Sequence, residues 1–206
     1  VPKYWQYRER PVLFNNWEGC MFDFNHRRLV NLAKEKGLFL FEAITTAHHP
    51  HYAVVKEKLP LLGRIKLVMA TFCQFSSRYP ALLAGKASPV LDHAFAGGAL
   101  MDINLYNIHF VVGLFGAPKS VRYFPNCHST GVDTSGTVLL EYDNFQCQCI
   151  GAKDCAAQNG VQIVGEAGNL IVTPSSSNCQ RVELNLRNQP QQTVALTENP
   201  WYYEVQ

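Results

Sequence analysis

The side chains best suited to chemistry lie in one largely apolar run, residues 97–109, which opens with two glycines. Within this run a carboxylate, a phenol and an imidazole occur at Asp102, Tyr106 and His109. If the run is helical, this spacing places all three side chains on one face. An acid, a phenol and an imidazole on one face of an otherwise apolar helix indicate a functional site. The alternative is a buried helix whose polar side chains serve a structural network.

The run is predicted to be helical because apolar residues recur along it and a stop signal follows. Gly116 suits the first position after a helix, and Pro118 comes shortly after it. Asn104 is a weak helix former but does not break a helix. The apolar positions of this predicted helix are Leu100, Ile103, Ile108, Val111, Val112, Leu114 and Phe115.

Residues just before the predicted helix are further candidates for contact with a substrate. Gly97 and Gly98 lack side chains, so the chain can approach a ligand closely there and enter the helix without obstruction. Lys86 and Asp92 lie in the preceding loop-rich stretch, residues 78–95, and are candidates for substrate binding. A solvated loop is the alternative explanation for both.

The glycine-led run resembles the Gly-Gly-x-Leu-x-Asp-x-Gly-x-His/Tyr signature of the Gfo/Idh/MocA oxidoreductases, in the branch of dihydrodiol dehydrogenase and glucose–fructose oxidoreductase. Asp102 matches the Asp of that signature, and Tyr106 matches its His/Tyr position. Asn104 stands where glycine is usual. The resemblance extends roughly from Asn25 to the C-terminus. Its other motifs, in the order of the family, are Leu32–Ala43, His49–Pro50, Leu114–Val121 and Gly165–Leu170.

The resemblance implies hydride transfer between NAD or NADP and the carbon of a sugar, polyol or dihydrodiol-type alcohol. Tyr106 would be the catalytic acid–base, and Asp102 would orient the substrate or polarise the network around it. For His109 a structural, hydrogen-bonded role is favoured over a proton relay. The resemblance also implies a homodimer formed through the β-sheet. The alternative is a truncated, non-catalytic paralogue that acts as a dimerising interaction domain.

The residues that bind the dinucleotide in this family are not found in this chain. The first turn of a Rossmann domain requires Gly-x-Gly, and no two of the 14 glycines are separated by one residue. We therefore predict that this chain alone binds neither NAD nor NADP. The catalytic lysine of the family is not assigned to Arg10, because an arginine stays protonated.

The predicted fold class is α+β, with a mostly antiparallel open β-sheet and helices packed on one face, similar to the C-terminal domain of glyceraldehyde-3-phosphate dehydrogenase. Residues 1–24 are predicted to be an atypical N-terminal segment. Residues 25–206 are predicted to form the substrate-binding and dimerisation domain, truncated at its C-terminus. Helices are expected at Asn25–Lys36 and His51–Leu59. Strands are expected at Leu38–Ile44, Gly63–Phe75, Ser120–Phe124, Thr137–Tyr142, Phe145–Gly151, Val161–Val164, Asn169–Val172 and Arg181–Leu186.

Composition narrows the classes of partner. A formal net charge of +2 argues against nucleic acid, and the absence of a long apolar run argues against a membrane span. The N-terminal residues have no apolar core of a signal peptide, so a cytoplasmic protein is expected. Cys147, Cys149 and Cys155 could suggest zinc, but Cys-x-Cys in a strand simply places both thiols on one face. Inert thiols and no metal are therefore expected.

Overall fold

The computed structural model describes residues 26–37, 44, 46, 49–86 and 88–195. Internal contacts divide the chain into two units, Val1–Ala43 with Gln206 and Ile44–Val205. The element described in the first unit is helix α2, His26–Lys36, which confirms the predicted helix there. Lys34 and Lys36 lie in its last turn, where positive side chains interact favourably with the negative end of the helix dipole. The predicted strand Leu38–Ile44 lies outside the described residues except for Ile44.

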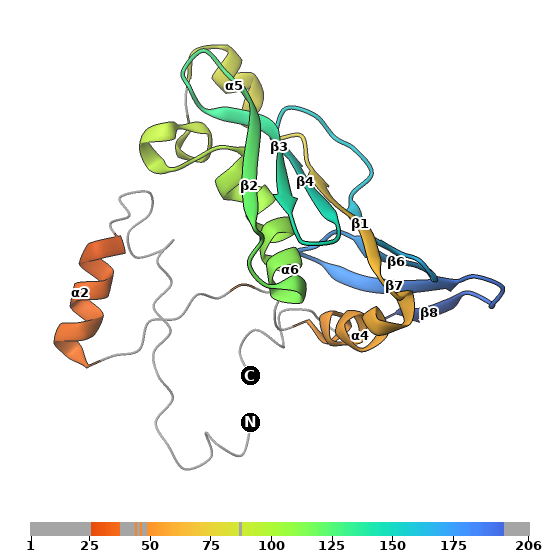
Figure 1. Ribbon diagram of the computed structural model, residues 1–206. Helices are drawn as coiled ribbons and strands as arrows, with labels where there is room; N and C mark the ends of the chain where they lie inside the picture. The colour runs from red at the N-terminus through yellow and green to blue at the C-terminus, as the bar shows by residue number, and fades with distance from the viewer. Residues whose placement is uncertain (1–25, 38–43, 45, 47–48, 87, 196–206) are drawn as a thin grey trace. The chain divides into compact units, whose positions relative to one another are not determined.

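The second unit contains one open β-sheet (Figure 1). The strand order is β2-β3-β4-β1-β5-β6-β7-β8. Strands β1 and β4 are parallel, and every other neighbouring pair is antiparallel. The strands are β1 Ile65–Cys73, β2 Ser120–Cys127, β3 Asp133–Glu141, β4 Gln146–Ala152, β5 Gly160–Gly165, β6 Gly168–Pro174, β7 Cys179–Leu186 and β8 Gln192–Ala195.

The predicted, mostly antiparallel sheet is thus confirmed. The parallel pair of β1 and β4 at its centre was not predicted. The chain leaves β1 at Cys73 and returns beside it only at Gln146, after a long crossover. A parallel pair requires such a crossover, because a tight hairpin can join only antiparallel strands. The crossover contains the whole predicted site, which therefore lies between the two central strands in the sequence.

The helices of the second unit are α4 Pro50–Lys58, α5 Tyr79–Leu83 and α6 Leu105–Phe115. Helix α6 packs against β1 and β4, and α4 packs against β7 (Figure 1). Tyr52 from α4 and Phe110 from α6 meet with their rings edge to face, 5.1 Å apart. The buried side chains of the sheet beneath them alternate along each strand: Val68, Ala70, Val138, Leu140, Cys147, Cys149, Val161, Ile163, Leu170, Val172, Val182 and Leu184.

Short helical turns connect β1 to α6. They are the 3₁₀ turns η3 Pro89–Leu91 and η4 His93–Phe95, and the π-helical segment η5 Leu100–Asn104. A further 3₁₀ turn, η2 Leu59–Leu62, follows α4. Leu82 and Leu91 form a second small core with Val132. The stretch expected to be loop-rich is therefore built from short turns that pack on one another.

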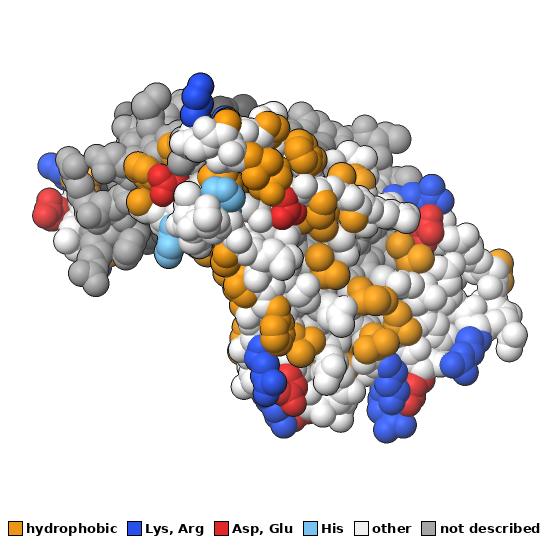
Figure 2. Space-filling model, turned by 90° about the horizontal axis from the view of Figure 1, so that it is seen from above, with side chains coloured by type: hydrophobic (Ala, Val, Ile, Leu, Met, Phe, Trp, Pro, Cys, Tyr) orange, Lys and Arg blue, Asp and Glu red, His pale blue; other side chains and the backbone are white. Residues whose placement is uncertain are grey.

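The opposite face of the sheet carries a mixture of apolar and amide side chains. Strand pairing places Leu139, Gln148, Met69, Gln162 and Ile171 in one continuous row across this face. Most of the row is half-buried. Leu67 is 50% exposed and Phe124 is 57% exposed, which is high for large hydrophobic residues. The face of the molecule drawn in Figure 2 likewise carries patches of hydrophobic side chains, with charged side chains gathered along its lower edge.

One described stretch, His93–Phe115, is long and apolar enough to resemble a membrane span by length and composition alone. Polar residues interrupt its apolar run. Phe110 and Val111 are fully buried in the core against the sheet. Burial accounts for part of the apolar character of the stretch, since 39% of its most apolar window is buried.

Candidate active site at the start of helix α6

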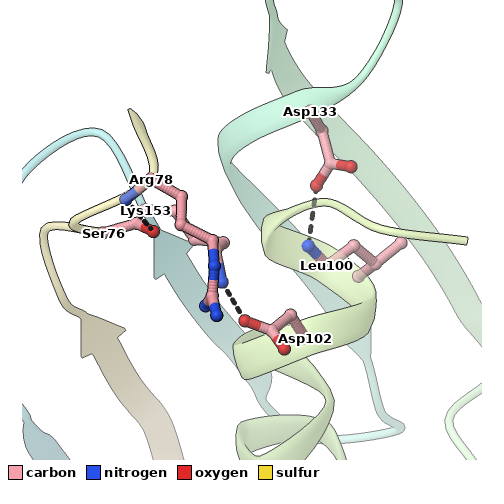
Figure 3. A network of polar contacts seen from close by, with 6 residues as sticks. All are labelled: Ser76, Arg78, Leu100, Asp102, Asp133 and Lys153. Atoms are coloured by element: carbon pink, nitrogen blue, oxygen red, sulfur yellow. Dashed lines mark hydrogen bonds and ion pairs between the residues drawn. The ribbon is translucent and has the colours of Figure 1, made fainter. Parts of the chain in front are cut away.

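The predicted helix does not begin as a regular α-helix. Its first segment, Leu100–Asn104, is π-helical, and the backbone N–H of Leu105 donates to the carbonyl of Leu100. Asp133 from β3 accepts a hydrogen bond from the backbone N–H of Leu100 at 2.7 Å (Figure 3). A carboxylate at this end satisfies a free N–H and interacts favourably with the helix dipole. The single α-helix of the prediction is therefore wrong over its first turn, which is wider.

Asn104 and Asn107 anchor the same helix to the sheet. The Asn104 side chain donates to the carbonyl of Cys149 at 3.0 Å. Asn107 donates to Asn104 Oδ1 at 2.9 Å and to the carbonyl of Ile150 at 3.0 Å. The hydroxyl of Ser176 in turn donates to Asn107 Oδ1 at 2.6 Å. Both asparagines are buried, so these bonds satisfy amides that would otherwise destabilise the core.

Asp102 forms an ion pair with Lys153, which follows the last residue of β4 (Figure 3). The Lys153 side chain is 8% exposed, whereas that of Asp102 is 38% exposed. The carboxylate therefore faces solvent in part, while its cationic partner is enclosed. Lys153 was not among the predicted site residues, because it lies 51 residues from Asp102 in the sequence.

Tyr106 lies after Asp102 on the same helix and is also partly exposed. Its ring packs against Phe72 of β1, with 6.1 Å between ring centroids. His109 is exposed on the same helix. The structure thus places Asp102 and Tyr106 on neighbouring turns with partial access to solvent, which suits a site that receives a small molecule.

The two glycines make room for protein atoms. A β-carbon at Gly97 would overlap the backbone of the 89–92 turn, and one at Gly98 would overlap the Asp133 carboxylate. Gly98 also has a φ of +124°, which side chains rarely adopt. Close packing on β3 and the preceding turn therefore requires glycine at both positions, whether or not a ligand approaches them. Their contact with a substrate stays a prediction.

The other two candidates lie outside the helix. Asp92 caps the short turn η4, because its Oδ1 accepts from the backbone N–H of Ala94 at 2.9 Å. Lys86 is exposed after α5, and its backbone N–H donates to Ala81 at 2.8 Å. A structural role therefore accounts for Asp92, and no described contact joins Lys86 to Asp102 or Tyr106. Substrate binding by either residue stays a prediction.

Tyr123 is a second residue that the sequence analysis missed. Its hydroxyl donates to Asp133 Oδ2 at 2.6 Å, the same oxygen that receives the Leu100 N–H. Burial and the neighbouring Asp133 carboxylate raise the pKa of Tyr123 above its usual range. Its ring covers Gly136, where a side chain would overlap it. A glycine inside a strand often marks such a close approach, and this is the signal that could have revealed the contact.

The described residues contain no group of three or more potential metal ligands. Cys147 and Cys149 are buried on the same face of β4, with 3.8 Å between their sulfur atoms, as the Cys-x-Cys spacing predicts. The hydrogen bond with Cys149 and burial raise the pKa of Cys147. A protonated, enclosed thiol is a poor metal ligand. The described residues contain no Gly-x-Gly turn of the kind that holds the pyrophosphate of a dinucleotide in a Rossmann domain.

Comparison with known proteins identifies two regions of similarity. The family model described as "GFO/IDH/MocA C-terminal domain" matches residues 60–171, which include β1, the candidate site and β2 to β5. A separate family model, melibiase, matches residues 1–42.

Curated relatives of the chain include dehydrogenases. A scyllo-inositol 2-dehydrogenase (NADP(+)) of Bacillus subtilis is 33% identical over 170 residues, which are 82% of this chain and 52% of the relative. A trans-1,2-dihydrobenzene-1,2-diol dehydrogenase of Macaca fuscata fuscata is 34% identical over 120 residues, 56% of this chain and 34% of the relative. The chain thus spans about half the length of the first of these relatives and a smaller share of the second.

Solved structures share the fold. A 3-ketoreductase from Actinomadura kijaniata, in complex with NADP, superposes with a TM-score of 0.65 at 20% identity, covering 87% of this chain and 54% of that structure. An inositol dehydrogenase homologue from Azotobacter vinelandii, in complex with NADH and myo-inositol, gives a TM-score of 0.62 at 13% identity, covering 82% of this chain and 45% of that structure.

Proposed function

Because the chain belongs to the GFO/IDH/MocA C-terminal domain family, we propose that it is the substrate-binding and dimerisation part of an oxidoreductase. The reaction is hydride transfer between NAD or NADP and an alcohol carbon of a sugar, polyol or dihydrodiol. The dehydrogenase relatives support this class of reaction. The observation that carries the proposal is the pairing of partly exposed Asp102 and Tyr106 on neighbouring turns of one helix.

In this proposal, the side chains of the chain bind the alcohol and move its proton. Tyr106 in its phenolate form accepts the hydroxyl proton when the alcohol is oxidised, and in its phenol form it donates a proton when a carbonyl is reduced. Asp102 accepts a hydrogen bond from a substrate hydroxyl and so fixes the orientation of the ring. A dinucleotide bound to a separate cofactor domain would supply the hydride chemistry, and the described residues are assigned only the binding of the alcohol and the transfer of its proton.

The remaining candidates surround this pair in the sequence. His109 follows Tyr106 on the exposed side of α6, and Gly97 and Gly98 precede the helix. Lys86 and Asp92 lie earlier in the crossover from β1. We propose that these five residues contact only those substrate hydroxyl groups that lie farther away than the one bound by Asp102. None of the five is assigned to catalysis.

Dimerisation is assigned to the sheet face opposite α4 and α6. Leu67 and Phe124 are exposed there, beside the row of apolar and amide side chains across the strands. Exposed apolar patches of this kind usually mark an interface. A second copy of the chain, placed face to face, would cover the same residues on both copies.

The boundary between the N-terminal segment and the family domain stays a proposal. The sequence motifs favoured a boundary after Phe24. Two observations favour a later one: the melibiase match ends at residue 42, and internal contacts separate Val1–Ala43 from the rest. The match to the Bacillus subtilis dehydrogenase covers 82% of the chain, which is more than residues 44–206 contain, so it begins before residue 44. We therefore propose that residues 25–206 carry the oxidoreductase part, and that the melibiase match overlaps its start.

The test joins residues 25–206 to the cofactor domain of the Bacillus subtilis relative and measures scyllo-inositol oxidation through NADPH absorbance. Tyr106→Phe should cut turnover by roughly two or more orders of magnitude, the scale of a lost acid–base group, while the protein still folds. Asp102→Asn should lower turnover as well.

Tyr142→Phe is the matched control, because the hydroxyl of Tyr142 donates to the backbone of Gly116 at 2.9 Å, after the end of α6. This variant should keep its turnover. Equal loss of folding in all three variants, with no specific loss of rate for Tyr106→Phe, would overturn the catalytic assignment. The full chain without an added cofactor domain should show no turnover.

A further inference from the structure

We propose that Lys153 is a positioning residue that holds the Asp102 carboxylate in place for a substrate hydroxyl. This inference rests on the proposed function of Asp102. Lys153 itself does not touch the substrate in this proposal, so its effect passes through Asp102.

The burial of Lys153 is the first observation. A lysine side chain that is 8% exposed is unusual, because an enclosed ammonium group is costly unless a negative charge compensates it. Asp102 is the carboxylate that it contacts. The other described lysine–carboxylate pairs are more exposed on the lysine side, as in Lys119–Asp143, where the lysine is 63% exposed. Lys153–Asp102 is therefore built into the fold and is not a pair of the solvated surface.

The backbone around Lys153 is fixed on both sides. Its N–H donates to the carbonyl of Thr134 at 2.7 Å, and its carbonyl accepts from the N–H of Ser76 at 2.8 Å. The next residue, Asp154, accepts from the hydroxyls of Thr134 and Ser135 at 2.8 Å and 3.0 Å. The ammonium group thus extends from a rigid point between the ends of β1, β3 and β4 (Figure 3).

The ion pair involves one oxygen of Asp102 and leaves the other for a substrate hydroxyl. Lys153 contacts Oδ2. No described residue donates a side-chain hydrogen bond to Oδ1, and the side chain is 38% exposed. Oδ1 is therefore available to accept a hydroxyl, while the ion pair restricts the torsions of the carboxylate. An oriented acceptor binds a hydroxyl with less loss of entropy than a mobile one.

The experiment uses the full chain and scyllo-inositol as the probe, titrated by NMR. Lys153→Met keeps a side chain of similar length without the charge, and should weaken scyllo-inositol binding by about tenfold, within the coupling range of paired side chains. Lys153→Arg restores a cation and should recover part of the affinity. Lys119→Met is the matched control at an exposed pair and should bind as the wild type does.

A double-mutant cycle separates positioning from a general structural role. In the Asp102→Asn background, Lys153→Met should cause no further loss of affinity, because its effect passes through Asp102. Equal affinity of Lys153→Met and the wild type, or losses that add in the double variant, would overturn the inference.

A second readout does not depend on substrate. The Nζ resonance of Lys153 in a ¹⁵N NMR spectrum should shift in Asp102→Asn and stay unchanged in Asp143→Asn. If the wild-type chain binds no scyllo-inositol, the proposed function loses support, and this resonance alone then decides the inference. A Lys153 signal that is the same in the wild type and Asp102→Asn would contradict it.

Discussion

His49 is a buried histidine at the N-terminal end of α4. Its side chain is 3% exposed, and among the described residues neither of its ring nitrogens has a hydrogen-bond partner. Its neighbour His51 is fully buried, and His51 Nδ1 lies 2.6 Å from the carbonyl of Cys179. Burial lowers the pKa of His49 below the usual 6.5, and nearby His51 lowers it further. The folded state therefore keeps His49 neutral under conditions where the unfolded chain takes up a proton.

This difference predicts a loss of stability in acid. The stabilising contribution is present above the unfolded pKa of 6.5 and is lost as the pH falls below it. Between about pH 6.5 and the lowered folded pKa, the free energy of unfolding should fall by up to about 1.4 kcal/mol per pH unit. His49→Leu should remove most of that slope, as measured by urea unfolding at several pH values. His93→Gln changes an exposed histidine and should leave the slope intact; an unchanged slope in His49→Leu would contradict the prediction.

At the candidate site, the sequence predicts residues of one helix far better than contacts between distant segments. The positions of Asp102 and Tyr106 followed from spacing within one run. Lys153 could not be predicted, since only the pairing of β1 with β4 brings it to the helix. Gly151 was a usable signal, because a side chain there would overlap Asn104. The π-helical segment begins where Asp133 accepts the N–H of Leu100, and no local pattern connects these two residues.

Helices α4 and α6 contact each other through Tyr52 and a glycine. The hydroxyl of Tyr52 donates to the carbonyl of Phe110 at 3.1 Å. A β-carbon at Gly113 would overlap that hydroxyl. Burial also raises the pKa of Tyr52 to about 12. Gly113 is therefore retained within a helix, where glycine is otherwise unfavourable, because Tyr52 occupies the space of its side chain.

This contact predicts a non-additive pair of variants. Gly113→Ala should destabilise the fold by about 1–3 kcal/mol through overpacking, although alanine itself favours a helix. Tyr52→Phe removes the overlapping hydroxyl. The double variant should therefore lose less free energy of unfolding than the two single variants lose in sum. Urea unfolding of the four proteins measures the coupling. Losses that simply add would exclude the contact as the cause.

The elements themselves were predicted well where their patterns are strong. The helix expected at His51–Leu59 is Pro50–Lys58, and the six strands expected from Gly63 to Val172 are present with small shifts at their ends. Strand β8 was missed, since Gln192–Ala195 has only four residues, of which two are polar. These four residues form a strand because they pair with β7, and their own sequence does not indicate that pairing.

At the scale of the whole molecule, the exposed sheet face predicts self-association. The full chain should have the mass of a dimer in light scattering at high concentration, and should dissociate on dilution. Leu67→Lys places a charge on the proposed interface and should favour the monomer. Leu83→Lys is the matched control, since Leu83 is 61% exposed but lies on α5, away from the sheet face.

A monomeric mass for the unmodified chain at every concentration would exclude this interface. Dissociation of Leu83→Lys and Leu67→Lys to the same extent would show that added charge alone is responsible.

The central position of β1 has a consequence for how the chain is made. Its two neighbours, β4 and β5, end at Ala152 and Gly165, far behind it in the sequence. On the ribosome, β1 therefore emerges long before either neighbour and spends that interval with both edges open. The middle of β1 is apolar, at Leu67, Val68 and Met69. The nascent chain therefore exposes an unpaired, aggregation-prone strand during this interval. Rapid synthesis of the crossover, or a chaperone that shields β1, would therefore limit aggregation before the sheet can close.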